Sequence, residues 1–160
     1  MARVLVVGCG CRGMALARAL PDHAVRGTTR SPERLPELDA AGIEGVVADP
    51  DRLATLVPAI SGVTVVCWLM GSAVESPTVH AERLTSLLEH LVDTHVRGFV
   101  YEGAGTVDAS VLQRGAQIVR TASETWRIRA EVVTTDPSAH DAWLEAMKEA
   151  VERTMSALTP

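Results

Sequence analysis

The segment that most constrains the fold of this chain is Gly-Cys-Gly-Cys-Arg-Gly at residues 8–13. It directly follows residues 3–7, an apolar run without alternation, which is the pattern of a strand buried on both faces. Residues 14–20, immediately after it, have the composition of a helix. A GxGxxG sequence between a strand and a helix is typical of the turn with which a dinucleotide-binding fold holds phosphates.

Each glycine of this turn has an expected role. Gly8 allows the tight turn, Gly10 lets a pyrophosphate approach the backbone, and Gly13 lets the helix pack close to the strand. The start of the helix offers free N–H groups and a partial positive charge to the phosphates. We therefore predict that Gly8, Gly10, Cys11, Arg12 and Gly13 bind a cofactor.

The segment about twenty residues further on indicates which dinucleotide is bound. In NAD-binding folds an acidic residue there accepts a hydrogen bond from the ribose 2′-OH. Residues 26–31 read Arg-Gly-Thr-Thr-Arg-Ser and contain no acid. Arg30, flanked by the hydroxyls of Thr29 and Ser31, favours the 2′-phosphate of NADP. The predicted cofactor is NADP, with NAD as the less favoured alternative.

Strands and helices alternate along the rest of the chain. We expect strands at 3–7, 24–28, 43–48, 63–67, 97–101 and 128–134, and helices at 14–20, 33–41, 50–59, 78–95, 108–126 and 138–158. This alternation predicts an α/β fold, a doubly wound parallel six-stranded sheet of Rossmann type in three layers with strand order 3-2-1-4-5-6. Gly71 follows the fourth strand, at the edge where such sheets bind ligands, and is a further candidate for cofactor binding.

Composition excludes several classes of function. The chain has 160 residues, 47% of them hydrophobic and 22% charged, which predicts a single globular domain over residues 1–160. A net charge of −5 gives no reason to expect binding to nucleic acid or to an anionic membrane. We expect no membrane span and no signal peptide, because the apolar runs are short, and hence a cytoplasmic location. Arginine supplies fourteen of the fifteen basic residues, a bias typical of GC-rich bacterial genomes.

The three cysteines are Cys9, Cys11 and Cys67. An odd count in a cytoplasmic protein argues against a disulfide framework, and the spacing matches no standard zinc pattern. We expect small residues that fill tight positions and no metal site. A redox or metal role near the cofactor is the alternative.

Several of these features together resemble the short-chain dehydrogenase superfamily, in particular its extended and atypical NmrA-like and epimerase-like branches. The residues that carry the resemblance are the glycine turn, Thr29–Ser31, Ala48-Asp49 and the segment 98–102, Gly-Phe-Val-Tyr-Glu. The resemblance implies that Asp49 lies beside the adenine and that the fifth strand leads to the active site. It also implies a homodimer formed through long helices.

The chain departs from this family where the family's chemistry takes place. Family members carry a Tyr-x-x-x-Lys pair on the helix after the fifth strand, and residues 111–126 contain neither Tyr nor Lys. The only tyrosine is Tyr101, and Lys148 is the only lysine. Glu102 ends the fifth strand and is the best single candidate for a catalytic base or a ligand contact, although a strand-end carboxylate can also simply cap a helix or bind an arginine.

Two functions follow from these observations. The first is a small NADP-dependent oxidoreductase acting on an unidentified small-molecule substrate, since the nicotinamide itself supplies the hydride chemistry. The second is a non-catalytic NADP-binding module with a sensing or regulatory role, which the absent Tyr–Lys pair favours. A degenerate scaffold that binds no nucleotide is disfavoured by the intact glycine turn.

Overall fold

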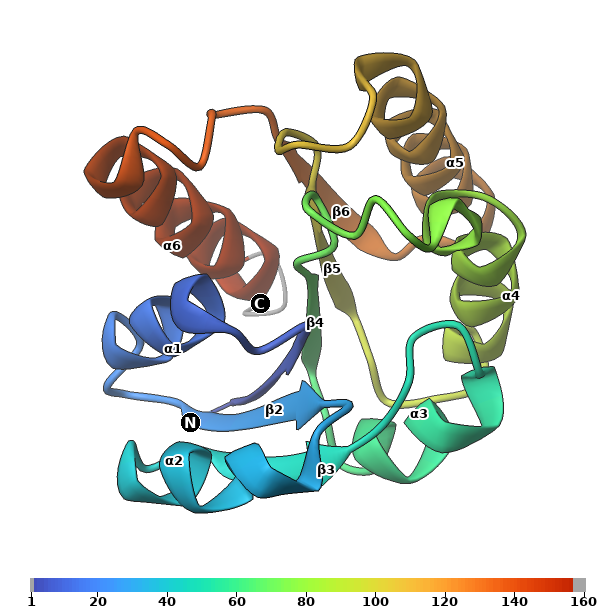
Figure 1. Ribbon diagram of the computed structural model, residues 1–160. Coiled ribbons are helices and arrows are strands. Elements are labelled where there is room, and N and C mark those ends of the chain that lie inside the picture. Colours follow the sequence, from blue (N-terminus) through green and yellow to red (C-terminus); the bar gives the residue numbers. More distant parts are fainter. Residues whose placement is uncertain (1, 157–160) are drawn as a thin grey trace.

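Six parallel strands form the central sheet of the computed structural model, which describes residues 2–156 (Figure 1). The strands are β1 (Arg3–Val7), β2 (Ala24–Thr29), β3 (Glu44–Val47), β4 (Val65–Trp68), β5 (Gly98–Glu102) and β6 (Arg129–Val133). Their spatial order is β3-β2-β1-β4-β5-β6, and every neighbouring pair is parallel. The strand order expected from the sequence is confirmed.

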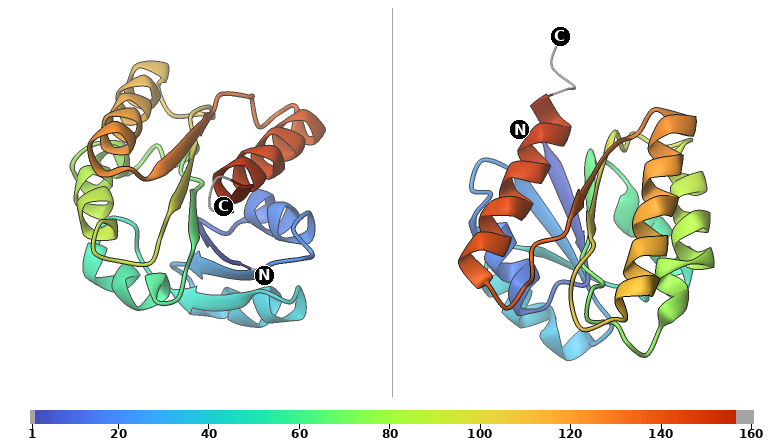
Figure 2. Two further views of the ribbon diagram at one scale, coloured as in Figure 1. Left: turned by 180° about the vertical axis from the view of Figure 1, so that it is seen from behind. Right: turned by 90° about the horizontal axis from the view of Figure 1, so that it is seen from above.

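Helices cover both faces of the sheet and complete three layers (Figure 2). The α-helices are α1 (Cys11–Arg18), α2 (Leu35–Ala40), α3 (Leu53–Ile60), α4 (Glu82–Leu91), α5 (Ala109–Trp126) and α6 (His140–Ser156), with two short 3-10 helices, η1 (Pro32–Arg34) and η2 (Pro77–His80). Side chains of α1, α2 and α6 pack into the core on one face, and those of α3, α4 and α5 pack into the core on the other. Within residues 2–156, no helix combines the length and the apolar character needed to cross a membrane.

The first strand shows why these apolar runs lack alternation. Val4 and Val6 point into the core beneath α1 and α6, whereas Leu5 and Val7 point into the core beneath α3, α4 and α5. All four side chains are buried. A strand covered on both faces has no solvent side on which polar residues would alternate.

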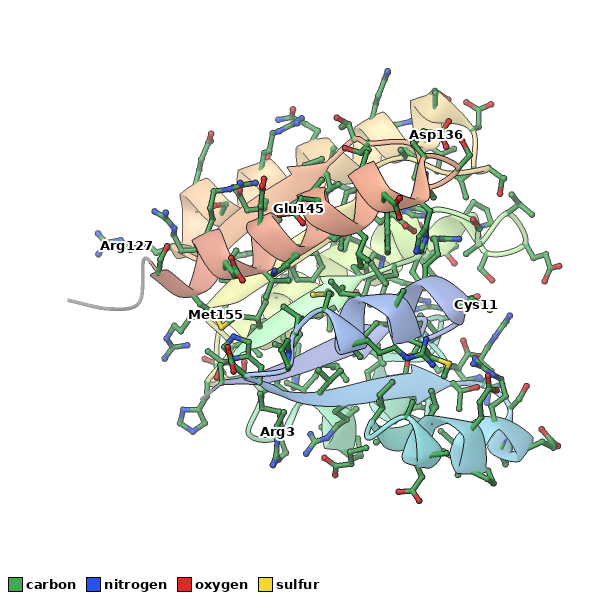
Figure 3. All side chains as sticks on the ribbon, turned by 90° about the vertical axis from the view of Figure 1, so that its left-hand side faces the viewer. Arg3, Cys11, Arg127, Asp136, Glu145 and Met155 are labelled. Carbon is green, nitrogen blue, oxygen red and sulfur yellow. The ribbon has the colours of Figure 1, made fainter. Side chains whose placement is uncertain are left out.

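The sheet brings its chemistry-bearing residues to one edge. Successive strands are added on one side of β1 up to β3 and on its other side from β4 to β6, so the strand order switches between β1 and β4. In open α/β sheets ligands bind beyond the carboxyl ends of the strands at this switch point. Figure 3 shows Cys11 and Asp136 towards that edge, and Arg127 and Met155 towards the opposite one. The loops that follow β1, β2, β3, β4 and β5 therefore form the candidate site.

Several element boundaries differ from the sequence-based expectation. The first helix begins at Cys11 and not at Met14, because Gly10 is its extended N-cap residue. The helix expected at 33–41 is a 3-10 turn followed by the short helix α2. The expected end of the last helix, at 157–158, lies outside the described residues.

The largest correction concerns the long helix expected at 78–95. Residues Pro77–His80 form the 3-10 helix η2, and α4 begins only at Glu82 and ends at Leu91. The backbone of Ala81, with φ −136° and ψ −113°, separates the two. His80 is buried and hydrogen-bonded on both ring nitrogens, so the chain breaks here to place that side chain in the core.

Candidate functional site

The glycine turn has the geometry that its sequence predicts. Gly8 has φ +84°, and a Cβ there would lie 2.7 Å from the Leu69 carbonyl oxygen. A Cβ on Gly10 would have no neighbour within 4 Å, so open space lies in front of the turn. A Cβ on Gly13 would lie 3.0 Å from Val6 Cγ1, which shows how closely α1 packs on β1. The first turn of α1 leaves its N–H groups without helical acceptors next to that open space.

A hollow of about 290 Å³ lies between the glycine turn and the ends of β2 and β3. It is lined by Gly8, Cys9, Gly10, Thr28, Thr29, Arg30, Ser31, Arg34, Ala48, Pro50 and Met70. A second hollow of about 270 Å³ shares Gly8, Gly10 and Met70 with the first and extends towards β4 past Cys11 and Arg12. A third, of about 150 Å³, shares Arg30, Pro50 and Met70 with the first and includes Asp49. Together the three hollows form a cleft, and Met70 lines every part of it.

Basic and hydroxyl side chains gather at the β2 end of this cleft. Arg30 is exposed directly after β2, and the N–H of Ser31 donates to Thr29 Oγ1 at 3.1 Å. Arg34, which sequence reasoning missed, lies one turn further on. Its Nη1 donates to the Cys9 carbonyl oxygen at 2.8 Å, which ties the segment after β2 to the glycine turn. An arginine four residues after Arg30 is too common a feature to have identified this contact from the sequence.

Asp49 lies at the β3 end of the cleft and is half-buried. Its Oδ1 accepts the N–H of Asp51 at 2.9 Å, and its own N–H donates to Thr55 Oγ1 at 2.8 Å. These bonds fix the turn that leads into α3 and hold the Asp49 side chain beside the third hollow.

Glu102 is completely buried, and both of its carboxylate oxygens accept hydrogen bonds. Its two carboxylate oxygens accept from Arg12 Nη2 at 2.9 Å and Arg12 Nε at 3.2 Å, and the Gly71 N–H donates to Oε1 at 2.8 Å. The Arg12 guanidinium also lies 5.7 Å from the centre of the Trp143 ring. The structure thus brings together two residues that the sequence placed in different segments, Arg12 and Glu102.

Gly71 is placed behind the wall of the cleft. A Cβ there would lie 2.2 Å from the Ala104 carbonyl oxygen, so the loop after β4 and the loop after β5 touch at this residue. Its N–H is already engaged by Glu102.

Tyr101 and His80 form a second buried contact, on the other face of the sheet. His80 Nε2 lies 2.8 Å from the Met70 carbonyl oxygen and Nδ1 lies 2.6 Å from the Tyr101 hydroxyl. Since a carbonyl only accepts, Nε2 carries the proton and the hydroxyl donates to Nδ1. Burial lowers the pKa of His80, against the opposing effect of the Met70 carbonyl, and burial raises the pKa of Tyr101 well above its ordinary value.

The cysteines differ in their surroundings. Burial raises the pKa of Cys9 to about 11 and that of Cys67 to about 12, whereas Cys11 is exposed at the start of α1. Cys9 and Cys11 line the cleft. Within residues 2–156, His, Cys, Asp and Glu side chains form no group that could hold a metal ion.

Comparison with solved structures supports the fold. The fold is similar to that of Citrobacter sp. triphenylmethane reductase complexed with NADP(H), at 17% identity and a TM-score of 0.67, over 83% of this chain and 49% of that one. Vestitone reductase from alfalfa matches at 17% identity and a TM-score of 0.65, over 84% of this chain and 56% of that one. UDP-glucuronic acid 4-epimerase from Bacillus cereus, in complex with NAD, matches at 16% identity and 0.62, over 85% and 59%.

The chain spans roughly half the length of these structures. No curated protein sequence matches it significantly. A family model described as NAD(P)H-binding matches residues 8–138, from the first glycine of the turn to the loop before α6. This chain is therefore a member of the NAD(P)H-binding family.

Proposed function

We propose that this protein binds NADP(H) in the cleft at the carboxyl edge of the sheet and prefers it to NAD(H). The observation that carries the preference is the lining of the first hollow, in which Arg30 and Arg34 are the charged residues and, within the described part of the chain, no carboxylate takes part. A guanidinium suits a 2′-phosphate, whereas an acid would suit a free 2′-OH.

The residues that would hold the nucleotide follow the cleft from end to end. They are Gly8, Gly10, Cys11, Arg12, Thr29, Arg30, Ser31 and Asp49, with Gly13 and Gly71 acting through the close backbone packing that they allow. The fit to a dinucleotide is supported by the open space before Gly10, which a larger side chain would fill.

Oxidoreductase activity on a small molecule is the first candidate activity. The bound nicotinamide supplies the hydride chemistry, and the protein supplies binding and orientation. A nucleotide-binding module without turnover is the second candidate, favoured by the buried ion pair that occupies Glu102. NADPH oxidation with a panel of small carbonyl compounds separates them: turnover supports the enzyme, and binding without turnover supports the module.

Calorimetry with NADPH and NADH tests the nucleotide preference. We expect NADPH to bind roughly tenfold more tightly or better, because a hydrogen bond to a charged group contributes about 1.5–3 kcal/mol. Arg30→Ala should remove most of the preference, whereas Arg120→Ala, on the exposed face of α5, should leave it intact. Equal affinities in the wild type, or a preference that survives Arg30→Ala, would contradict the proposal.

Gly10→Val tests the place of binding. Gly10 has an extended backbone with negative φ, −88°, and a Cβ there would have no neighbour within 4 Å, so the variant should fold. It should lose nucleotide binding, because the side chain would occupy the space of the pyrophosphate. Normal binding by the folded variant would place the nucleotide elsewhere.

A further inference from the structure

Two walls of the second hollow are anchored through one buried carboxylate, that of Glu102. The hollow lies on the β4 side of the glycine turn, does not include Arg30, and has Arg12 and Ser72 among its lining residues. If the nucleotide binds as proposed above, on which this inference rests, Arg30 takes the adenosine and the glycine turn the pyrophosphate. The nicotinamide end would then bind in the second hollow.

One wall of this hollow is α1, which is anchored through Arg12. Its guanidinium makes a two-pronged contact with Glu102, through Nε at 3.2 Å and Nη2 at 2.9 Å. Such paired contacts fix the orientation of both side chains and not merely their separation. The Trp143 ring on α6 lies beside the same guanidinium, 5.7 Å from its centre, and limits its movement.

The other wall is the loop after β4, and it is anchored through the same carboxylate. Glu102 Oε1 accepts the Gly71 N–H at 2.8 Å, next to its bond with Arg12 Nη2. A Cβ at residue 71 would lie 2.8 Å from that oxygen, so this approach requires glycine. The preceding residue, Met70, is held from the opposite face of the sheet through His80 and Tyr101.

The charges favour a fixed pair over a reactive carboxylate. Glu102 has no exposed surface and accepts three hydrogen bonds, while the Arg12 side chain is 29% exposed. A buried carboxylate is stable in its charged form only when it is paired and hydrogen-bonded in this way. With no exposed surface, the Glu102 carboxylate offers a substrate no direct access.

We propose that Arg12 and Glu102 are a positioning pair. They set the separation between the glycine turn and the loop after β4, and this separation determines where the nicotinamide binds. Glu102 acts through Arg12 and Gly71 and does not itself touch the substrate. The pair joins three segments far apart in the sequence, at residues 12, 71 and 102, around one carboxylate.

Two nucleotide probes distinguish an effect on the nicotinamide end from a general loss of structure in the cleft. Adenosine 2′,5′-bisphosphate lacks the nicotinamide half and reports the Arg30 end and the glycine turn, whereas NADPH reports the whole cleft. Glu102→Gln keeps the side-chain shape and one oxygen for Gly71, but its amide nitrogen cannot accept from Arg12. We expect NADPH to bind about tenfold more weakly, the effect of losing one charge-assisted hydrogen bond, with less than a twofold change for the bisphosphate. The fluorescence of bound NADPH should change as well, because it reports the surroundings of the nicotinamide.

Glu44→Gln is the matched control. Glu44 also pairs with a buried arginine, Arg26, at 3.1 Å, but on β3 and away from the cleft lining, so both probes should bind as in the wild type. Arg12→Lys, which keeps the charge and loses the two-pronged contact, should repeat the selective loss and decides the matter if Glu102→Gln does not fold.

An equal loss for both probes, or no loss, would overturn the positioning role while leaving the proposed function intact. A wild-type protein that binds neither probe would overturn the proposed function and the positioning role together.

Discussion

Cys9 and Cys11 stand two residues apart in the glycine turn and have opposite surroundings. The Cys9 side chain is buried against Gly27, whereas Cys11 is exposed at the first position of α1 and lines the second hollow. Burial raises the pKa of Cys9 to about 11 and that of Cys67 to about 12. The thiolate is the reactive form, so these two thiols are protected both by burial and by their pKa.

We predict that a thiol reagent at pH 8 modifies one cysteine of the native protein rapidly, and that this one is Cys11. At that pH only about one Cys9 side chain in a thousand is a thiolate, by its distance from the raised pKa. NADPH should slow the reaction, since Cys11 lines the proposed nucleotide cleft. Cys11→Ser should remove the fast phase. Rapid modification of all three thiols, or a fast phase retained in Cys11→Ser, would contradict this assignment.

Single residues of the candidate site differ in how far the sequence reveals them. The roles of Gly8, Gly10 and Gly13 depend on a local motif, and the structure gives each the predicted geometry. Arg34 and His80 depend on which segments meet in space, so neither is visible in a local pattern. Their contacts, with the Cys9 carbonyl and with Tyr101, join residues 25 and 21 positions apart.

Among the elements, α4 shows where periodicity misleads. Leu84, Leu87, Leu88 and Leu91 form the apolar stripe of a real helix, but residues 78–80 do not belong to it. The spacing of hydrophobic residues does not indicate that the His80 side chain is buried and hydrogen-bonded to the Met70 carbonyl and the Tyr101 hydroxyl. The central strands β1 and β4 are easier to predict, since both of their faces are covered and their sequences are largely apolar.

Helix α5 contains a glycine, Gly115, at a position where the neighbouring Tyr101 leaves no room for a side chain. Gly115 lies mid-helix, where alanine is ordinarily more stable by roughly 0.5–1 kcal/mol. A Cβ there would lie 2.0 Å from the Tyr101 hydroxyl oxygen, which His80 holds in place. We predict that Gly115→Ala lowers the free energy of unfolding, measured by urea denaturation, by about 1–3 kcal/mol, the usual effect of overpacking.

The control for this prediction lies on the same helix. Gln117→Ala changes an exposed position and should alter the free energy of unfolding by no more than about 0.5 kcal/mol. A Gly115→Ala protein as stable as the wild type would show that Tyr101 moves aside at little cost.

At the scale of the whole molecule, topology is the property that the sequence predicts best. Six strands alternating with helices allow few arrangements, because parallel crossovers are right-handed and neighbouring elements pack together. The order β3-β2-β1-β4-β5-β6 follows, and with it the edge where the site lies. The sequence does not reveal how the last two residues of β5 hold the loop after β4 from opposite faces of the sheet. Glu102 does so directly, through the Gly71 N–H, and Tyr101 does so through His80, which bonds the Met70 carbonyl.

One of these two contacts links the stability of the entire fold to pH. Burial lowers the pKa of His80 in the folded protein below its ordinary value near 6.5. The unfolded chain therefore binds a proton at this side chain more readily than the folded protein does. It follows that the stabilising effect of neutral His80 is complete above about pH 7.5 and declines as pH falls through 6.5 towards the lower folded pKa.

We predict that the free energy of unfolding, measured by urea denaturation between pH 8 and pH 5, falls below pH 6.5 with a slope of at most about 1.4 kcal/mol per pH unit from this group. His80→Gln should lower stability at neutral pH and flatten the slope, because the side chain no longer titrates. His95→Gln, at an exposed position after α4, should keep the wild-type slope. An unchanged slope in His80→Gln would contradict the prediction, because it would show that His80 does not link the stability of the fold to pH.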